Sequence, residues 1–226
     1  MMGKKMRSFD EIFDIAAKRK GGVAALEASL SVPLTSAELA ATSDDRWLAA
    51  MAKCLFQAGF NWKVIETKWP GMEAAFDGFD PVRIQAYHDE DVDRLLSDKR
   101  IVRNGAKVNA VIQNAHFIKE IALEAGSAGA YFSEWSKTQY VDLLATLSKR
   151  GSRLGSVTGQ RMLHSMGKDS FVLSPDVVTR LVAEAVVEKA PSSKRDLLAT
   201  QRAFDTWTEQ SGRGLTQVSQ VLAFSV

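Results

Sequence analysis

"LFQAGFNW", residues 55–62, is the stretch that decides the fold. Apolar residues recur at helical spacing before and into it, at Trp47, Leu48, Met51 and Leu55. This spacing predicts a helix that ends near Gly59, since glycine commonly closes a helix. Phe60 and Trp62 then follow closely, on either side of a polar asparagine. A helix that ends on two aromatic side chains predicts a corner that holds or inserts into something.

The rest of the chain also has a helical pattern. Apolar residues keep the 3.6-residue spacing in segments 108–118, 140–147, 177–185, 197–207 and 215–222. Turn-forming residues separate such segments at 69–71, 78–81, 103–105, 126–130, 150–159, 173–175, 190–193 and 211–214. Alternating strand patterns are missing. We therefore predict an all-α bundle of about ten helices.

The domain organisation follows from the same pattern. Residues 1–226 are expected to form a single helical body, as one compact lobe or as two lobes with a cleft. Residues 1–45 carry the weakest pattern, weakly helical around Pro33, and form a distinct N-terminal segment. A later helix is expected to start at Ser174 as its N-cap, with Pro175 in its first position.

Composition excludes several classes of protein. With 46% hydrophobic and 25% charged residues, the 226-residue chain is typical of a soluble globular protein. No apolar run approaches the roughly 20 residues that span a bilayer. The N-terminal stretch "MMGKKMRSFDEIFD" has no apolar segment behind its basic residues, so no secretory signal is expected. The single cysteine, Cys54, rules out an internal disulfide. We expect a cytoplasmic monomer.

Two segments are rich in basic residues, although the net charge is only +2. Residues 94–107 hold five basic side chains against one acid, and residues 149–168 hold five without an acid. Such segments predict one positive face for phosphate binding. The alternative is a pair of solvated helix ends, and the pattern alone does not decide between them.

No metal or cofactor site is predicted. His88, His116 and His164 lie on different helical segments without an i, i+4 partner, whereas a metal needs three or four converging ligands. The sequence has no Ser-His-Asp spacing, no phosphate-binding loop and no dinucleotide fingerprint. Cys54 is most simply a buried helical thiol.

The segment 149–167, "KRGSRLGSVTGQRMLHSMG", predicts a helix end, a tight turn over residues 154–159 and a new amphipathic helix. The exposed amides that start the second helix carry the positive end of its dipole. With Arg153 and Arg161, the turn could clamp a DNA phosphate, as a helix-hairpin-helix does without reading sequence. The alternative is a simple corner between two helices. The turn at residues 103–107 has the same ambiguity.

Several short motifs together resemble one family. They are Gln57-Ala58-Gly59, Trp62, Phe79-Asp80-Pro81, Ile101-Val102-Arg103-Asn104, Lys107 and Asn114-Ala115. In this order and spacing over residues 54–115, they resemble the class I 3-methyladenine DNA glycosylases, and a weaker likeness continues to about Val177. Members of that family are helix-hairpin-helix enzymes of base-excision repair.

The resemblance implies base flipping on duplex DNA that carries an alkylated base. It places Phe60 beside Gly59 as the wedge that fills the stack, and Cys54, Gln57 and Trp62 in the base pocket. A cationic alkylated adenine favours the electron-rich ring of a tryptophan. The implied contacts to the DNA backbone are Arg103, Lys107, Arg153, Leu154, Gly155, Ser156, Gly159 and Arg161.

The chain also departs from the family. The family has a glutamate eight residues before the tryptophan, where this chain has Cys54. Its four zinc ligands have no counterpart, and the last two positions hold Asp176 and Arg180, which are expected to form an i, i+4 ion pair. The aspartate of the wider superfamily falls near Ser174.

Two functional hypotheses follow. In the first, the protein is a glycosylase without zinc. The missing carboxylate then comes from the N-terminal segment, for example Glu27 or Glu38, or the preferred lesion differs. In the second, it is a catalytically inactive helix-hairpin-helix protein that binds damaged or distorted DNA. A helical scaffold without a role on DNA is the third and weakest hypothesis.

Overall fold

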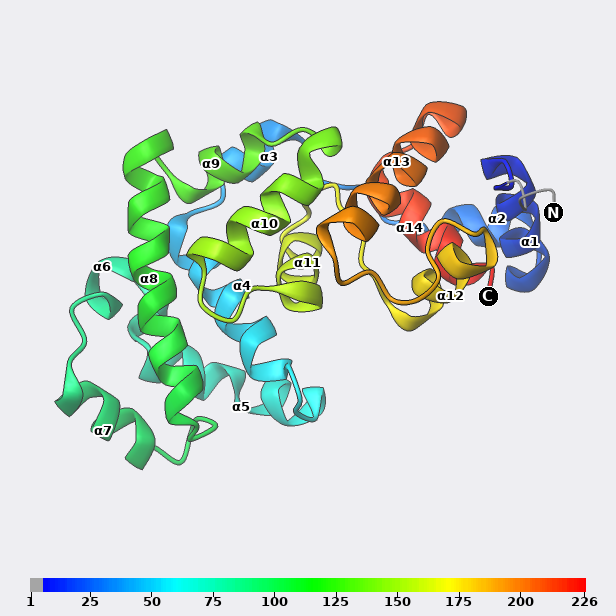
Figure 1. The fold of residues 1–226 in the computed structure, drawn as a ribbon. Helices are drawn as coiled ribbons and strands as arrows, with labels where there is room; N and C mark the ends of the chain where they lie inside the picture. The colour runs from blue at the N-terminus through cyan, green and yellow to red at the C-terminus, as the bar shows by residue number, and fades with distance from the viewer. Residues whose placement is uncertain (1–5) are drawn as a thin grey trace. The chain divides into compact units, whose positions relative to one another are not determined.

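The structure, a computed structural model, describes residues 6–226 apart from the side chain of Ser156 (Figure 1). Residues 1–5, the start of the stretch examined for a secretory signal, lie outside the described residues. The helices are α1 Phe9–Lys20, α2 Val23–Ala28, α3 Ser36–Ala40, α4 Asp44–Gln57, α5 Trp62–Ala75, α6 Pro81–Ile84, α7 Asp89–Ser97, α8 Gly105–Ala125, α9 Ala128–Glu134, α10 Tyr140–Arg150, α11 Ser156–Ser165, α12 Pro175–Ala183, α13 Lys194–Ser211 and α14 Leu215–Phe224. Two short 3-10 helices cover Asp77–Phe79 and Lys137–Gln139. Since residues 6–226 contain no strand, the predicted all-α class is confirmed.

The described residues hold fourteen α-helices rather than about ten, because four short ones escaped the pattern. Helices α2, α3, α6 and α9 have 4 to 7 residues, which is too short for a 3.6-residue period to repeat. Polar N-caps set the start of three of them: the side chains of Thr35, Asp80 and Ser127 each accept a backbone N–H. Local capping therefore defines these helices.

The break expected at residues 69–71 is wrong, because α5 continues through Pro70. Proline lacks the N–H that would bond one turn back, so the helix loses a hydrogen bond there. Packing offsets that loss: the Trp69 ring stacks on Phe79 with centroids 5.3 Å apart, and Met72 is fully buried. Tertiary contacts therefore decide the length of α5.

The chain divides into two compact units. Among the described residues, the first contains 6–34, 136–143 and 167–226, and the second contains 35–135 and 144–166. In the first unit, α14 packs against α1, α12 and α13, so the start of the chain joins the C-terminal helices. The sequence pattern did not predict this partnership. The expected single body, whether one lobe or two with a cleft, stays a prediction.

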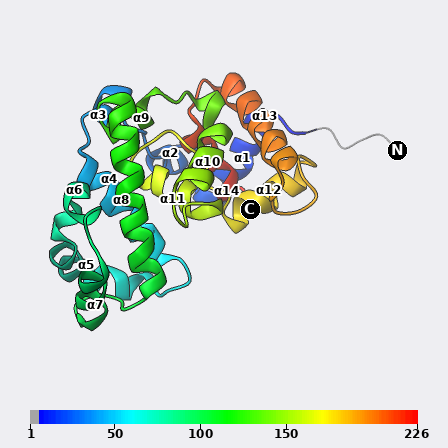
Figure 2. The ribbon, with the colours of Figure 1, turned by 60° about the vertical axis from the view of Figure 1, so that its left-hand side comes forward.

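The second unit is built around α8. This long helix packs against α4, α6, α7 and α9, and Figure 2 shows it running beside α4 and α6. Trp47 of α4 lies against Phe132 of α9 with ring centroids 4.4 Å apart, and both side chains are fully buried. No helix of the described chain is long and apolar enough to cross a bilayer.

Candidate functional site

The corner predicted at residues 55–62 connects α4 to α5. Helix α4 ends at Gln57, and Gly59 adopts a φ of 69°, a left-handed conformation that glycine accepts readily. The Asn61 side chain then caps α5 by accepting the Lys63 N–H at 2.9 Å. This tight reversal leaves Phe60 46% exposed and Trp62 48% exposed. The corner thus presents two large aromatic side chains.

Lys107 of α8 binds the backbone of this corner. Its ammonium donates to the carbonyl oxygens of Phe56 at 3.0 Å and Ala58 at 2.8 Å, and it lies 5.7 Å from the Phe60 ring centroid. Burial, together with the positive charge of Arg153, lowers the pKa of Lys107. Lys107 was predicted to bind a DNA phosphate. Two of its three N–H donors instead hold the end of α4.

Cys54 lies one turn before the end of α4 and is buried. Burial raises the pKa of its thiol, against the opposing effects of the Ser165 hydroxyl and the charges of Arg161 and Lys53. The thiol is therefore neutral at pH 7. It supplies neither the negative charge nor the strong acceptor that a carboxylate would give at the same position.

Arg161 of α11 stacks on Trp62, with its guanidinium carbon 4.8 Å from the ring centroid. The sequence predicts Arg161 on the DNA backbone and Trp62 in the base pocket. The structure brings the two together, because α11 packs against α4. A positive charge therefore already lies against one face of the tryptophan ring.

Glu66 of α5 adds a carboxylate that the sequence pattern did not predict. One of its carboxylate oxygens accepts a hydrogen bond from the Gln57 amide at 3.1 Å, and the other lies 2.9 Å from the Lys53 ammonium. Gln57 is buried, whereas the Glu66 side chain is 54% exposed. Trp62 and Glu66 are four residues apart in one helix, a spacing that places two side chains on one face. That spacing is the one signal that could have linked them.

The two N-terminal acids proposed to replace the missing carboxylate have other partners. Glu27 forms an ion pair with Arg213 at 2.5 Å. Glu38 closes a capping box at the start of α3, where it accepts from the Thr35 backbone at 2.8 Å. Glu27 and Glu38 are therefore both engaged elsewhere in this structure, and the expectation that one of them supplies the carboxylate stays a prediction.

The connection between α10 and α11 differs slightly from the predicted turn at residues 154–159. Helix α10 ends at Arg150 and α11 begins at Ser156, so Gly159 lies in the first turns of α11. A Cβ atom at Gly159 would collide with the carbonyl oxygen of Leu154, which explains the glycine. The turn itself contains Arg153, exposed and with a φ of 58°, the buried Leu154 and Gly155, the N-cap of α11.

Asn114 of α8 fixes this turn through both ends of its amide. Its oxygen accepts the Ser152 N–H at 2.7 Å, and its nitrogen donates to the Ser152 carbonyl at 3.1 Å. The side chain is fully buried. Lys107 and Asn114 thus hold the aromatic corner and the turn to the same helix. We refer to residues 151–161 below as the hairpin.

Most cations of the two basic segments already have partners. Arg94 pairs with Asp91, Arg100 pairs with Asp98, and Arg150 pairs with Glu120 and Glu124 of α8. Lys168 is buried. The broad positive face predicted from the charge pattern is therefore reduced, and its remaining exposed candidates are Lys99, Arg103, Lys149 and Arg153.

The residues at the family's zinc positions do not fit a metal ion. Arg180 is buried and donates to the Ser225 hydroxyl at 2.7 Å and to the Ser225 carbonyl oxygen. It pairs with Glu184 at 3.2 Å, so the predicted pair with Asp176 is wrong. A guanidinium has no lone pair to offer a metal. Ser174 serves as the predicted N-cap of α12 and accepts the Val177 N–H.

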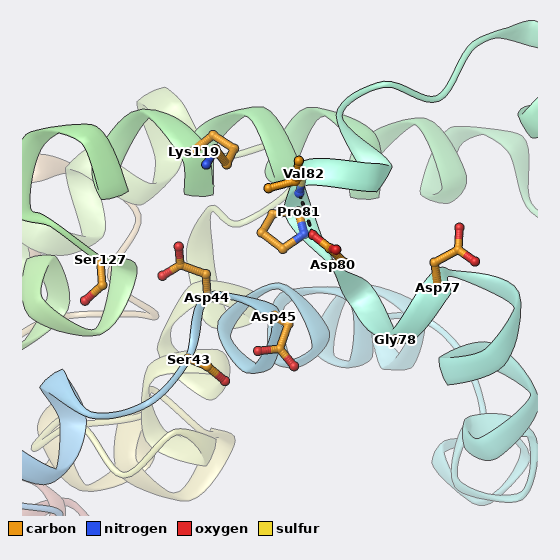
Figure 3. Close-up of a pocket in the computed structure, with 10 residues that line it drawn as sticks. All are labelled: Ser43, Asp44, Asp45, Asp77, Gly78, Asp80, Pro81, Val82, Lys119 and Ser127. Atoms are coloured by element: carbon orange, nitrogen blue, oxygen red, sulfur yellow. Dashed lines mark hydrogen bonds between the residues drawn. The ribbon is translucent and has the colours of Figure 1, made fainter.

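A separate acidic depression of about 600 Å³ lies on the second unit (Figure 3). Four aspartates line it, and each accepts a hydrogen bond from the protein: Asp44 from Ala128, Asp45 from Arg46, Asp77 from Tyr87 and Asp80 from Val82. No group of three metal-binding side chains occurs among the described residues. These acids cap helices and pair with neighbours.

Comparison with known proteins places this geometry in a family. The pattern of the family described as methyladenine glycosylase matches residues 39–174. The DNA-3-methyladenine glycosylase 1 of Escherichia coli K12 is 42% identical over 59 residues, which is 26% of this chain and 32% of the relative. The match thus spans about a third of that relative's length.

Solved structures show the same fold. A 3-methyladenine DNA glycosylase I from Staphylococcus aureus aligns with a TM-score of 0.51 and 23% identity over 61% of this chain and 80% of its own. A 3-methyladenine DNA glycosylase I in complex with 3-methyladenine aligns with a TM-score of 0.51 and 20% identity over 64% and 85%. The family pattern covers more than half of the chain, and the aromatic corner and the hairpin both lie inside it. The chain belongs to the methyladenine glycosylase family.

Proposed function

We propose that the protein is a DNA repair glycosylase that removes 3-methyladenine, or a related alkylated base, from duplex DNA. The observation that carries the proposal is the pair of exposed aromatic side chains, Phe60 and Trp62, at a corner inside the matched residues 39–174. An enzyme that acts on a base in a duplex has to extrude it from the stack. A corner that presents two aromatic rings suits this task.

The two rings have different roles in the proposal. Phe60 follows the left-handed Gly59, where the backbone has no side chain to keep it from the DNA, and it enters the gap that the flipped base leaves. Trp62 stacks on the flipped base, and Gln57 and Cys54 line the pocket beside it.

The chemistry requires little acid–base assistance. When the C1′–N bond of the alkylated nucleotide breaks, its electron pair neutralises the cationic base, which leaves as a stable molecule. Water then adds to C1′ and loses a proton, which leaves an abasic site. Groups that stabilise the positive charge of the base and of the sugar in the transition state therefore speed this step more than proton transfer does.

The DNA backbone is held by the hairpin and by the turn before α8. The contacts proposed from the sequence are Arg103, Arg153, Leu154, Gly155, Ser156, Gly159 and Arg161, with the third N–H of Lys107. The free amides at the N-terminus of α11 suit a phosphate, and such contacts carry no sequence preference. We further propose a monomer that acts in the cytoplasm, since a single buried cysteine suits a reducing compartment.

The test is the release of free base from methylated duplex DNA, measured by mass spectrometry. We expect 3-methyladenine in the soluble fraction and a much slower release in the Phe60→Ala and Trp62→Ala variants. If the protein in molar excess over the lesion releases no base, the glycosylase proposal is wrong. Salt-dependent DNA binding without release would then support the inactive DNA-binding alternative.

A further inference from the structure

We infer that Glu66 is a specificity-determining residue of this site, whose carboxylate selects a cationic alkylated purine over a neutral one. The inference rests on the proposed glycosylase function and names the residue that recognises the lesion. It concerns α4 and α5, both of which belong to the second unit.

The helices place Glu66 at the aromatic corner. In α5, Trp62, Glu66 and Trp69 follow the i, i+4, i+7 spacing of one helix face. In α4, Lys53 and Gln57 are likewise four residues apart. These two faces meet: Gln57 and Lys53 both contact Glu66, and the Lys53 ammonium also lies 5.1 Å from the Trp69 ring centroid.

The contacts also orient Gln57. Its amide nitrogen donates to Glu66 at 3.1 Å, so its carbonyl oxygen points elsewhere and keeps its capacity to accept. Gln57 is 8% exposed, while half of the Glu66 side chain is accessible. The carboxylate is therefore accessible one helical turn from Trp62, beside a Gln57 amide with a defined direction.

The charges around Trp62 make Glu66 decisive. The Arg161 guanidinium lies over the Trp62 ring at 4.8 Å, and Lys53 lies beside Gln57 and Glu66. Cys54 is neutral because burial raises the pKa of its thiol. Without Glu66, a cationic base would meet two like charges and no opposite one from these residues. Glu66 thus supplies the negative charge of this group and offsets part of the positive charge that a cationic base would meet.

The ligand class follows from this arrangement. A purine alkylated on a ring nitrogen, while still bound to sugar, carries a positive charge and an exocyclic amine that donates hydrogen bonds. A carboxylate accepts such a bond and attracts the charge, and charged hydrogen bonds are the stronger kind. A neutral purine gains the stacking on Trp62 without the attraction.

The competing explanation is that Lys53 and Glu66 form only a surface ion pair. Exposed pairs of this kind contribute little to stability. The two explanations predict different effects of removing Lys53 on the binding of a cationic ligand. A structural pair is lost equally when either partner is removed, whereas a recognition carboxylate becomes a stronger ligand once the competing ammonium is gone.

The experiment measures equilibrium binding of two probes to the full-length protein by quenching of tryptophan fluorescence. The cationic probe is 3,9-dimethyladeninium, in which a methyl group replaces the sugar, and the neutral control is 9-methyladenine. The variants are Glu66→Gln, which keeps an acceptor for Gln57, and the matched Lys53→Met, which keeps the aliphatic stem near Trp69.

We expect the wild-type protein to bind the cation more tightly than the neutral base. Glu66→Gln should weaken cation binding about tenfold or more, and Lys53→Met should strengthen it severalfold, with the neutral probe unchanged. If both variants weaken cation binding alike, or Glu66→Gln changes nothing, the inference is overturned. If the sign pattern holds but methylated DNA yields no free base, Glu66 keeps its role and the glycosylase function fails.

Discussion

Two carboxylates, one in each unit of the chain, lie in contrasting environments. In the first unit, the Glu184 carboxylate is fully buried and lies between Arg7 at 2.6 Å and Arg180 at 3.2 Å. In the second unit, the Glu66 carboxylate is half exposed, with Lys53 at 2.9 Å. Both carboxylates have a cationic neighbour, so the main difference between them is their exposure to solvent.

The difference separates stability from recognition. A buried charge without a partner costs several kcal/mol, so a buried pair has to stay intact. An exposed pair contributes ~1 kcal/mol or less, so it can open for a ligand at little cost. The family pattern, residues 39–174, covers nearly all of the second unit, while most of the first lies outside it. We therefore expect the first unit to contribute stability and the second to contribute recognition.

Removal of Glu184 should have the largest effect on stability. Glu184→Ala leaves Arg180 buried without its charge partner and should lower the free energy of unfolding by about 3–5 kcal/mol. Urea denaturation followed by circular dichroism measures this change. The matched Glu66→Gln variant should lose no more than ~1 kcal/mol. Equal losses in the two variants would remove the distinction between the units.

The same carboxylate should make stability depend on pH. Burial alone would raise the pKa of Glu184, but hydrogen bonds from Arg7 and Arg180 outweigh it and hold the pKa below the ordinary value of 4.5. The stabilisation is therefore complete above pH 4.5 and is lost as the pH falls through the folded-state pKa. Denaturation curves at decreasing pH should show this decline in the wild type and a shallower one in Glu184→Ala. Parallel curves would contradict the assignment.

Asn114 tests whether α8 positions the hairpin. Asn114→Ala leaves the Ser152 amide and carbonyl without their partners and should cost about 1–3 kcal/mol. DNA affinity, measured by fluorescence anisotropy, should fall as well, although Asn114 is fully buried. His116→Ala changes an exposed residue of the same helix and should alter neither quantity. Unchanged DNA affinity in Asn114→Ala would show that the hairpin is not the phosphate-binding element.

Local signals explain which parts of the fold were predictable. The end of α4 was predicted because Gly59 breaks a clear apolar period, and the start of α12 because Ser174 and Pro175 form a standard N-terminus. The course of α5 was not predictable, since the stacking of Trp69 on Phe79 outweighs a proline within the helix. Tertiary packing is invisible to a pattern that considers neighbouring residues alone.

The same reasoning applies to the candidate site. Glu66 was missed because its significance lies in contacts with α4 across the corner, which no local spacing records. The capping role of Glu38 was visible in the sequence, because Thr35 and Glu38 have the spacing of a capping box. Lys107 had the expected position in the family motif, but its bonds to Phe56 and Ala58 span about fifty residues of chain.

Phe60 should have the smallest effect on stability and a clear effect on function. Its ring is 46% exposed, so Phe60→Ala should change the free energy of unfolding by no more than ~0.5 kcal/mol. Base release should slow about tenfold or more, because holding a base out of the stack costs a few kcal/mol and the wedge compensates for it. Val82→Ala removes another exposed apolar side chain of the second unit and should affect neither. A Phe60→Ala variant that loses stability and activity together would place Phe60 in the core of the corner and leave the wedge to another residue. Retained stability with lost activity would assign the ring to recognition, which is the role expected for the second unit.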